Sequence, residues 1–325
     1  MRRAILAAML LACAPAALAD PLPSWNATGT EAAIVNFVTR VADPASPDFV
    51  PEAARIAVFD NDGTLWSEKP FYFQGLYALQ RLRDKAAADP ALLKDATLEA
   101  AAKGDLAAVL AGGEKGLVEI LDVSHAGLTV DAFQSDAHAW LTTAKHPTSG
   151  LTYAEMTFQP MLELLSYLRD NDFSTYIVSG GGVDFMRAIA RQAYGVSPWQ
   201  VVGSEGGTRY VPGPDGAPVL MKEGGVAFID DGPGKPVGIE RHIGQRPIFA
   251  AGNSDGDLQM LQWTTAGAGP RFGLLVHHTD GVREFAYDRT SDVGRLDKAL
   301  DAAPAEGWTV VDMKTDWARI WSGEK

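Results

Sequence analysis

The feature that most constrains the fold is the alternation of apolar, strand-like runs with amphipathic stretches after residue 158. Apolar side chains recur at helical intervals over 161–171, whereas 174–181 has the pattern of a buried strand that ends in glycines. The same pattern predicts strands over 199–205, 217–222, 226–230, 247–254 and 272–278, and helices over 184–195, 235–244 and 257–263. Because strands that alternate with helices build a largely parallel sheet covered on both faces, we expect a three-layer α/β core.

Residues 66–157 have a different character, because Ala-rich, helix-forming stretches dominate and no strand pattern is convincing there. A strand is predicted just before them, over 55–59, and a helix over 30–42 precedes that strand. With 325 residues, of which 46% are hydrophobic, the chain can form a large core and an additional subdomain. We therefore expect an α/β core formed by residues 20–65 and 158–325, and an inserted α-helical cap formed by residues 66–157.

Residues 1–19 have the pattern of a secretory signal peptide. Arg2 and Arg3 precede a short apolar run, and Ala17-Leu18-Ala19 fits the small-x-small rule for signal peptidase. The apolar run is too short to span a bilayer. The sequence therefore predicts cleavage after Ala19 and a periplasmic or secreted protein without a membrane span. Lipid attachment at Cys13, the single cysteine of the chain, stays open as the alternative.

The charge balance narrows the range of partners. The formal net charge at pH 7 is −13, whereas nucleic-acid binding needs Lys and Arg side chains that neutralise phosphates. A nucleic-acid partner is therefore not expected, and the acidic surface mainly favours solubility. No feature of the sequence predicts an oligomeric state.

Polar side chains follow three of the predicted strands, at the point where each strand ends. Lys235 opens the helix that precedes the third of these strands. Because open parallel sheets bind ligands at the carboxyl ends of their strands, we expect the polar groups to surround one crevice. The three turns are Asp60-Asn61-Asp62-Gly63-Thr64, Ser179-Gly180-Gly181-Gly182 and Asn253-Ser254-Asp255-Gly256-Asp257.

The residue types in these turns suit phosphoryl transfer. Asp60 and Asp62 repel each other unless a cation lies between them or one of them holds a proton. Mg²⁺ with oxygen ligands is the usual cation where a phosphate is bound as well. Ser179 and the glycine N–H groups after it offer neutral donors to phosphoryl oxygens. Lys235 adds a positive charge that offsets the charges of the nucleophile and the phosphate.

These motifs resemble those of the haloacid-dehalogenase-like (HAD) superfamily, phosphatase branch. The resemblance covers about residues 55–280, through "DNDGT", "IVSGG", the lysine of "GPGKPVGIE" and "AGNSDGDLQML" in that order. It implies a Rossmann-like core, and the inserted helices are similar to the cap of the phosphoserine-phosphatase-like group. It further implies that Asp60 is the nucleophile and Asp62 the general acid/base, while Ser179 binds the phosphoryl group and Lys235 steadies the nucleophile.

The resemblance also implies metal and substrate contacts. Many relatives have an aspartate where this chain has Asn253, and an uncharged amide should hold Mg²⁺ less tightly. The expected metal ligands are Asp60, the backbone carbonyl of Asp62, and Asn253 or one of Asp255 and Asp257. The expected substrate contacts are Thr64, Glu68, Gly180 and Gly181.

The pattern as a whole predicts an exported, Mg²⁺-dependent phosphomonoester hydrolase that acts on a small phosphorylated metabolite through an aspartyl-phosphate. Asp62 favours this function because the dehalogenases of the superfamily lack the second aspartate. Two alternatives stay open. One is a phosphotransferase that uses the same intermediate, and the other is a catalytically weak binding protein, which only Asn253 favours. Lys222 competes with Lys235 for the role of the catalytic lysine, but we expect it to be solvated at a hairpin edge.

Overall fold

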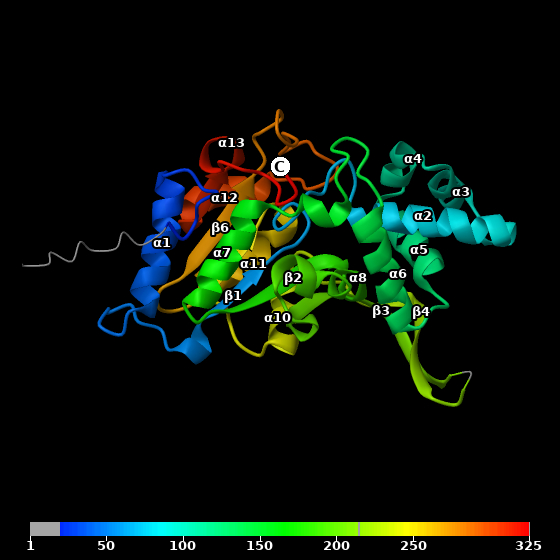
Figure 1. The fold of residues 1–325 in the computed structure, drawn as a ribbon, viewed down its shortest axis with the longest axis horizontal. Helices are drawn as coiled ribbons and strands as arrows, with labels where there is room; N and C mark the ends of the chain where they lie inside the picture. The colour runs from blue at the N-terminus through cyan, green and yellow to red at the C-terminus, as the bar shows by residue number, and fades with distance from the viewer. Residues whose placement is uncertain (1–19, 214, 325) are drawn as a thin grey trace, which may run out of the picture.

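The computed structural model describes residues 20–213 and 215–324 of the chain (Figure 1). The predicted signal peptide and Cys13 lie outside the described residues. The described chain forms a seven-stranded sheet with helices on both faces and a group of helices beyond one end of the sheet. Within these residues, no helix is long and apolar enough to cross a membrane.

The strands follow the order β4-β3-β2-β1-β5-β6-β7 across the sheet. Neighbouring strands pair in parallel except β3 and β4, which form an antiparallel hairpin. Because β1 lies between β2 and β5, the strand order reverses there and opens a crevice at the carboxyl ends of these strands. The strands are β1 (Ile56–Phe59), β2 (Ser174–Gly182), β3 (Val201–Pro212), β4 (Pro218–Phe228), β5 (Phe249–Gly252), β6 (Phe272–His277) and β7 (Thr309–Asp312).

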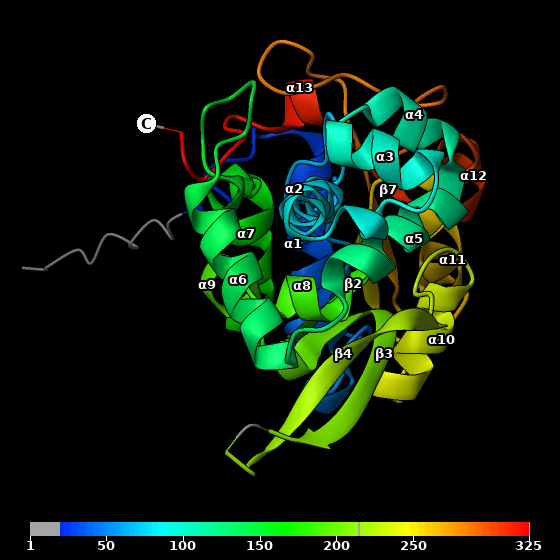
Figure 2. The same cartoon turned by 90° about the vertical axis from the view of Figure 1, so that its right-hand side faces the viewer.

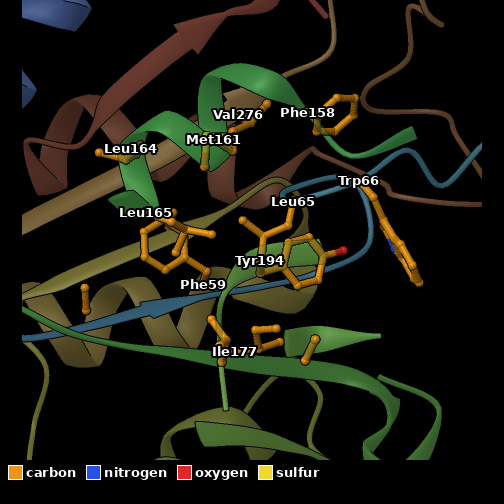
Figure 3. Packing of buried hydrophobic residues seen from close by; sticks show 14 of the residues in the cluster. Phe59, Leu65, Trp66, Phe158, Met161, Leu164, Leu165, Ile177, Tyr194 and Val276 are labelled. Atoms are coloured by element: carbon orange, nitrogen blue, oxygen red, sulfur yellow. The ribbon is translucent and has the colours of Figure 1, made fainter. Parts of the chain in front are cut away.

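Helices cover both faces of the sheet because successive strand residues point to opposite sides. On β1, Phe59 belongs to the same buried cluster as residues of α1 (Gly29–Ala42) and α7 (Gln159–Asp170). Figure 3 shows part of this cluster, where Leu165 of α7 lies over Phe59. Val58 belongs to the cluster on the other face, which contains residues of α10 (Gly234–His242), α11 (Leu258–Thr265) and α12 (Lys298–Glu306). The predicted three-layer α/β core is confirmed.

The segment between β1 and α7 is largely helical. Leu79, Leu82 and Leu98 belong to an apolar cluster that lies apart from those of the sheet. At the base of the segment Trp66 and Thr157 form a β-bridge, so the chain enters and leaves it side by side. The division into core and cap at residues 66 and 157 stays a prediction. The helices are α2 (Phe73–Ala88), α3 (Ala96–Lys103), α4 (Leu106–Ala111), α5 (Gly113–His125) and α6 (Val130–Thr143).

The β3–β4 hairpin differs from the sequence prediction. Instead of three short strands over 199–205, 217–222 and 226–230, the chain forms the two long strands β3 and β4. The pairing shifts register around Gly206, so a glycine-rich stretch that resembles a break is accommodated as a bulge. The hairpin extends away from the sheet beside the cap helices (Figure 2). Lys222 ties it to the cap, because its carbonyl accepts from Gly127 N–H at 3.0 Å and its own N–H donates to Leu128 O at 2.8 Å.

Two further elements depart from the predicted pattern. The helix predicted over 184–195 is divided into α8 (Val183–Arg187) and α9 (Ala190–Tyr194), because Ile189 leaves the helical conformation with φ of −126°. β7 adds a strand beyond the last predicted one by pairing with β6. Its four residues are too few to give a strand pattern in the sequence.

Candidate active site

A cavity of about 290 Å³ lies between the carboxyl ends of the central strands and the cap helices. The sheet side contributes four predicted residues, Asp60, Asp62, Ser179 and Lys235. Residues from α2, α5, α6 and the β3–β4 hairpin form the remaining wall, among them Gln74, Leu121, His125, Phe133 and Lys222. The fold thus brings the four residues that the sequence predicts as catalytic into one crevice.

Lys235 lies between two carboxylates at the strand ends. Its Nζ donates to Asp60 Oδ1 at 2.7 Å, to Asp257 Oδ1 at 2.5 Å and to the Val178 carbonyl at 3.1 Å. Burial acts to lower the pKa of Lys235, but the charges of Asp257 and Asp60 outweigh it and hold that pKa above its usual value. Burial and the neighbouring Asp257 raise the pKa of Asp60, so the contact with the ammonium is what favours the ionised form of Asp60.

Asp62 reaches the same cavity from the turn that follows β1. The turn is closed by the Asn61 carbonyl, which accepts from Leu65 N–H at 2.8 Å. Asp62 Oδ1 accepts a hydrogen bond from Trp66 Nε1 at 2.7 Å. Burial raises the pKa of Asp62 to about 6, against the opposing effects of Trp66 and Lys235. A carboxyl group with such a pKa can both donate and accept a proton near neutral pH.

Residues 179–182, called the glycine bulge below, interrupt the pairing of β2 with β3. Ser179 pairs with Gly203 and Gly182 with Ser204, so Gly180 and Gly181 are left out of the backbone pairing between β2 and β3. Ser204 Oγ donates a hydrogen bond to the Gly180 carbonyl at 2.8 Å, and Gly181 N–H donates to Ser179 Oγ at 3.2 Å. The Ser179 hydroxyl proton is then available to a ligand, as a phosphate-binding role requires.

Asn253 lies beside the turn that carries Asp62 and is held on three sides. Its Nδ2 donates to Glu68 Oε1 at 2.8 Å, and its Oδ1 accepts from Thr64 Oγ1 at 3.1 Å. Its backbone N–H donates to Asp257 Oδ2 at 2.9 Å. These bonds fix the orientation of the amide, with the oxygen directed to Thr64 and the nitrogen to Glu68.

Glu68 lines the cavity, as a substrate-binding residue should. Its Oε1 also accepts from Tyr287 Oη at 2.7 Å, in addition to the bond from Asn253. Burial raises the pKa of Glu68 to about 7, while the charge of His278 and the bond from Tyr287 lower it. Glu68 therefore fixes the Asn253 amide by accepting its hydrogen bond. That Glu68 contacts a substrate stays a prediction.

Gly63 gives this arrangement a direct test. Its φ is +72°, and a Cβ at this position would lie 2.0 Å from Asn253 Nδ2 and 2.4 Å from Glu68 Oε1. We expect Gly63→Ala to displace both side chains and to lower turnover about tenfold, the scale of 1–3 kcal/mol of local strain. Steady-state kinetics measure the effect.

Gly216→Ala is the matched control, because Gly216 has φ of +81° but a Cβ there would meet nothing within 4 Å. It carries the backbone strain without the collision, and we expect wild-type turnover. An equal loss in both variants would show that strain alone, and not the displacement of Asn253 and Glu68, causes the effect.

The oxygen atoms near Asn253 are of the kind that Mg²⁺ prefers. Asp60 uses only Oδ1 toward Lys235, and Asn253 Oδ1 has a single donor. The Asp62 carbonyl accepts no hydrogen bond from the residues that the structure describes. Among those residues, no group of three His, Cys, Asp or Glu side chains is arranged to hold a metal ion. A carboxylate, a backbone carbonyl and an amide are a different donor set, and their chemistry fits Mg²⁺.

The two other candidate ligands are engaged elsewhere. Asp257 Oδ1 accepts from Lys235, and its Oδ2 accepts from the N–H groups of Asn253 and Ser254. Asp255 Oδ1 accepts from two N–H groups around the start of α12, those of Asp297 and Ala299, both at 3.0 Å. These bonds give both aspartates structural roles, and metal ligation by either of them stays a prediction that the geometry disfavours.

Thr64 and Lys222 have positions that the sequence did not predict. Thr64 is fully buried outside the cavity lining, so it orients Asn253 and does not face a substrate. Lys222 is not solvated: its side chain is 8% exposed, and its Nζ pairs with Asp184 Oδ2 at 2.5 Å. The reason is that the hairpin packs on the cap, and the ammonium lies over the ring of Phe133.

Gln74 and His125 of the cap also line the cavity, although no sequence motif points to them. Gln74 Oε1 accepts from Gly182 N–H at 2.7 Å, and Gln74 Nε2 lies 3.2 Å from His125 Nε2. The contact to Gly182 spans 108 residues of sequence. A single helical glutamine or histidine gives no local signal for such a contact.

Solved structures of other proteins resemble this fold. A conserved protein of unknown function from Anaerococcus prevotii shares 15% identity, with 77% of this chain and 86% of that chain covered and a TM-score of 0.50. A protein of unknown function from Bordetella pertussis shares 18% identity, with coverages of 80% and 98% and a TM-score of 0.48. A phosphoserine phosphohydrolase-like protein from Francisella tularensis shares 17% identity, with coverages of 70% and 89% and a TM-score of 0.37. No curated protein sequence matches the chain.

A family model gives the identification. The model of the haloacid dehalogenase-like hydrolases matches residues 57–262, more than half of the chain. The match begins in β1 and ends in α11, so it includes every strand-end turn that lines the crevice. It confirms the resemblance drawn from the four motifs and the assignment of the protein as an enzyme of the hydrolase class. The chain belongs to the haloacid dehalogenase-like hydrolase family.

Proposed function

We propose that this protein is a Mg²⁺-dependent phosphatase that hydrolyses the phosphate monoester of a small metabolite. The observation that supports this most directly is the convergence of Asp60, Asp62, Ser179 and Lys235 on one cavity, with a buried ammonium 2.7 Å from the Asp60 carboxylate. The cavity of about 290 Å³ is of a size that suits a small ligand. A second aspartate at position 62 supplies the proton transfer that ester cleavage needs.

The first half of the reaction forms a covalent intermediate. A carboxylate oxygen of Asp60 attacks phosphorus, the ester P–O bond breaks, and Asp62 gives its proton to the departing alkoxide, which leaves as an alcohol. Ser179 and the N–H of Gly180 donate hydrogen bonds to the phosphoryl oxygens in the glycine bulge. Lys235 favours the ionised form of Asp60 before the attack.

The second half returns the enzyme to its starting state. Asp62, now a carboxylate, takes a proton from a water molecule whose oxygen attacks phosphorus, and the bond between Asp60 and phosphorus breaks. Inorganic phosphate leaves, Asp60 is again a carboxylate and Asp62 again holds a proton. The cap wall over the cavity limits the access of bulk water during the first half.

The residues that would hold Mg²⁺ are Asp60, the carbonyl of Asp62, and Asn253. Bound there, the ion would neutralise charge on the phosphoryl group and on Asp60. The N-terminal pattern, Arg2 and Arg3 before a short apolar run and Ala17-Leu18-Ala19, supports export to the periplasm or the medium with cleavage after Ala19.

Hydrolysis of p-nitrophenyl phosphate by the purified mature protein tests the proposed function. We expect turnover with millimolar Mg²⁺, loss of at least about 90% of it when EDTA removes the metal, and recovery when Mg²⁺ is restored. A panel of phosphorylated metabolites then identifies the substrate class. Absence of Mg²⁺-stimulated turnover on every phosphomonoester would overturn the proposal and favour a binding protein with this fold.

The same assay separates hydrolysis from transfer. Glycerol added as an acceptor would yield glycerol phosphate if the aspartyl-phosphate passes to alcohols, and inorganic phosphate alone if water is the acceptor. We expect phosphate as the main product, with at most a minor fraction of glycerol phosphate.

A further inference from the structure

The N–H of Gly182 donates a hydrogen bond to a cap residue. The glycine bulge displaces the end of β2 from regular pairing, because Ser179 and Gly182 pair with adjacent residues of β3. Gly182 N–H instead donates to Oε1 of Gln74, at the start of α2, at 2.7 Å. A Cβ on Gly182 would lie 2.6 Å from Gln74 Nε2, so the backbone lies directly against the amide. One end of the bulge is therefore positioned by a cap residue.

His125 determines which way the Gln74 amide points. Ser124 Oγ donates to the Leu121 carbonyl at 3.1 Å, so its lone pairs face His125 Nδ1 at 2.6 Å. Nδ1 then carries the ring proton, and Nε2 is left to accept from Gln74 Nε2–H at 3.2 Å. With the amide nitrogen at His125, the amide oxygen must face Gly182. The hydrogen bonds from Ser124 through His125 and Gln74 to Gly182 therefore have one consistent assignment of donors and acceptors.

The surroundings hold His125 in this state. Burial, with the nearby charges of Lys222 and Lys85, lowers the pKa of His125 to about 3, so the ring is neutral and Nε2 keeps its lone pair. The rings of Tyr77 and Phe133 pack against the imidazole, with centroid distances of 5.8 Å and 4.7 Å. This packing disfavours a rotation of the ring that would turn Nε2 away from Gln74.

Gln74 is also close to the reacting groups. A Cβ on Gly181 would lie 3.6 Å from Gln74 Oε1, 3.6 Å from Ser179 Oγ and 3.5 Å from Asp62 Oδ2. A shift of the bulge toward or away from Gln74 therefore changes the distance between the phosphate donors and the general acid. Gln74 Oε1 accepts from Gly182 N–H, and one of the two N–H groups of Gln74 Nε2 faces His125, so the contact to Gly182 links Gln74 to the phosphate donors.

We propose that Gln74 is a positioning residue that fixes the glycine bulge for phosphoryl binding, and that His125 acts through Gln74 by setting the orientation of its amide. The cap then takes part in building the phosphate site, in addition to covering the substrate. This inference rests on the proposed phosphatase function for its kinetic consequences, but the contact itself has a readout that needs no activity.

The main test compares Gln74→Met with Gln80→Met. Met has nearly the shape of Gln but cannot accept from Gly182 N–H. Gln80 lies on the same helix, and its Nε2 donates to Asp84 Oδ1 at 2.9 Å, on the surface of the cap. We expect Gln74→Met to lower kcat/KM about tenfold, the scale for a buried donor left without its partner, and to weaken orthovanadate inhibition by the same factor. Gln80→Met should stay within about twofold of wild type on both measures.

The loss of kcat/KM in Gln74→Met, measured with different leaving groups, shows whether Gln74 positions the glycine bulge or contacts the substrate directly. A positioning effect acts on the phosphoryl group, so the tenfold loss should be the same for p-nitrophenyl phosphate and for smaller alkyl phosphates. A loss that appears as a higher KM for one leaving group only, with orthovanadate inhibition unchanged, would overturn the proposal and make Gln74 a substrate contact.

A double-mutant cycle tests the role of His125. We expect His125→Phe to lower kcat/KM about threefold, and the double variant with Gln74→Met to be no worse than Gln74→Met alone, because both changes act through one amide. Additive losses would show that His125 acts independently of Gln74 and would overturn that half of the proposal.

Amide hydrogen exchange gives the readout that does not depend on catalysis. In the peptide that contains Gly182, one amide should exchange faster in Gln74→Met than in wild type, whereas Gln80→Met should match wild type. Unchanged exchange would overturn the inference even if the enzyme is a phosphatase. If wild type hydrolyses no phosphomonoester but the exchange difference is present, the proposed function fails and the structural link from cap to bulge stands.

Discussion

Asp60→Asn should abolish phosphate release from p-nitrophenyl phosphate while leaving the fold intact. The amide has the shape of the carboxylate and can still accept from Lys235 Nζ, so the hydrogen bond at Oδ1 is retained. It is, however, a very poor nucleophile toward phosphorus. We expect kcat to fall at least about 10⁴-fold, the scale on which the loss of a covalent nucleophile acts in other hydrolases.

The same substitution at Asp43 is the matched control. Asp43 follows α1, where its Oδ1 accepts from Ala45 N–H at 2.9 Å, and it does not line the cavity. Asp43→Asn keeps an oxygen acceptor there, and we expect turnover within about twofold of wild type. Urea denaturation of both variants checks that each is folded. Wild-type turnover in Asp60→Asn would show that the nucleophile is misassigned.

The parts of the site that could be predicted from the sequence are those whose spacing is local. Asp60 and Asp62 stand two residues apart at the end of an apolar strand, and Ser179 precedes a run of glycines, so the backbone alone determines their direction. The same holds for Lys235, which lies at the start of the helix that leads into the parallel strand β5. The order of strands then brings these turns to one edge.

The parts that could not be predicted depend on contacts between distant segments. Lys222 looks like a solvated hairpin residue until the hairpin packs on the cap and places it beside Asp184 and Phe133. Gln74 and His125 are ordinary helical residues until α2 meets the glycine bulge. Nothing in the local sequence encodes these approaches, because each depends on how the inserted helices dock on the sheet.

The position of Asn253 in the fourth motif can be recognised from the sequence, but its surroundings depend on a residue from a distant segment. From the sequence it is an aspartate position that has lost its charge. In the structure Glu68 lies 2.8 Å from its amide nitrogen, so a carboxylate is present beside the position after all. Glu68 belongs to the start of the cap segment, so a comparison of the fourth motif alone cannot detect this neighbouring carboxyl group.

Lys235→Met should damage both activity and stability, and the size of the second effect should depend on pH. Lys235 is 1% exposed, and its ammonium donates to Asp60, Asp257 and the Val178 carbonyl. Removing one partner of a buried ion pair while the others stay typically costs about 3–5 kcal/mol. Activity should fall about 10³-fold, because the charge that stabilises the nucleophile and the phosphoryl group is lost.

The direction of the pH effect follows from the two carboxylates that remain. Without Lys235, burial and mutual repulsion raise the pKa of one of them in the folded state above its unfolded value of about 4. The folded variant then binds a proton that the unfolded chain has released, so its stability decreases as pH rises above that unfolded value. The stability deficit relative to wild type should therefore be larger at pH 8 than at pH 5.

Urea denaturation of Lys235→Met and wild type at the two pH values measures this difference, with Lys298→Met as the control. Lys298 is an exposed lysine at the start of α12, so its loss should change the midpoint little at either pH. A deficit that is the same at pH 5 and pH 8 would mean that the lysine contributes only packing. A deficit that grows with pH means that its charge keeps Asp60 and Asp257 ionised side by side, which is the state that a nucleophilic Asp60 requires.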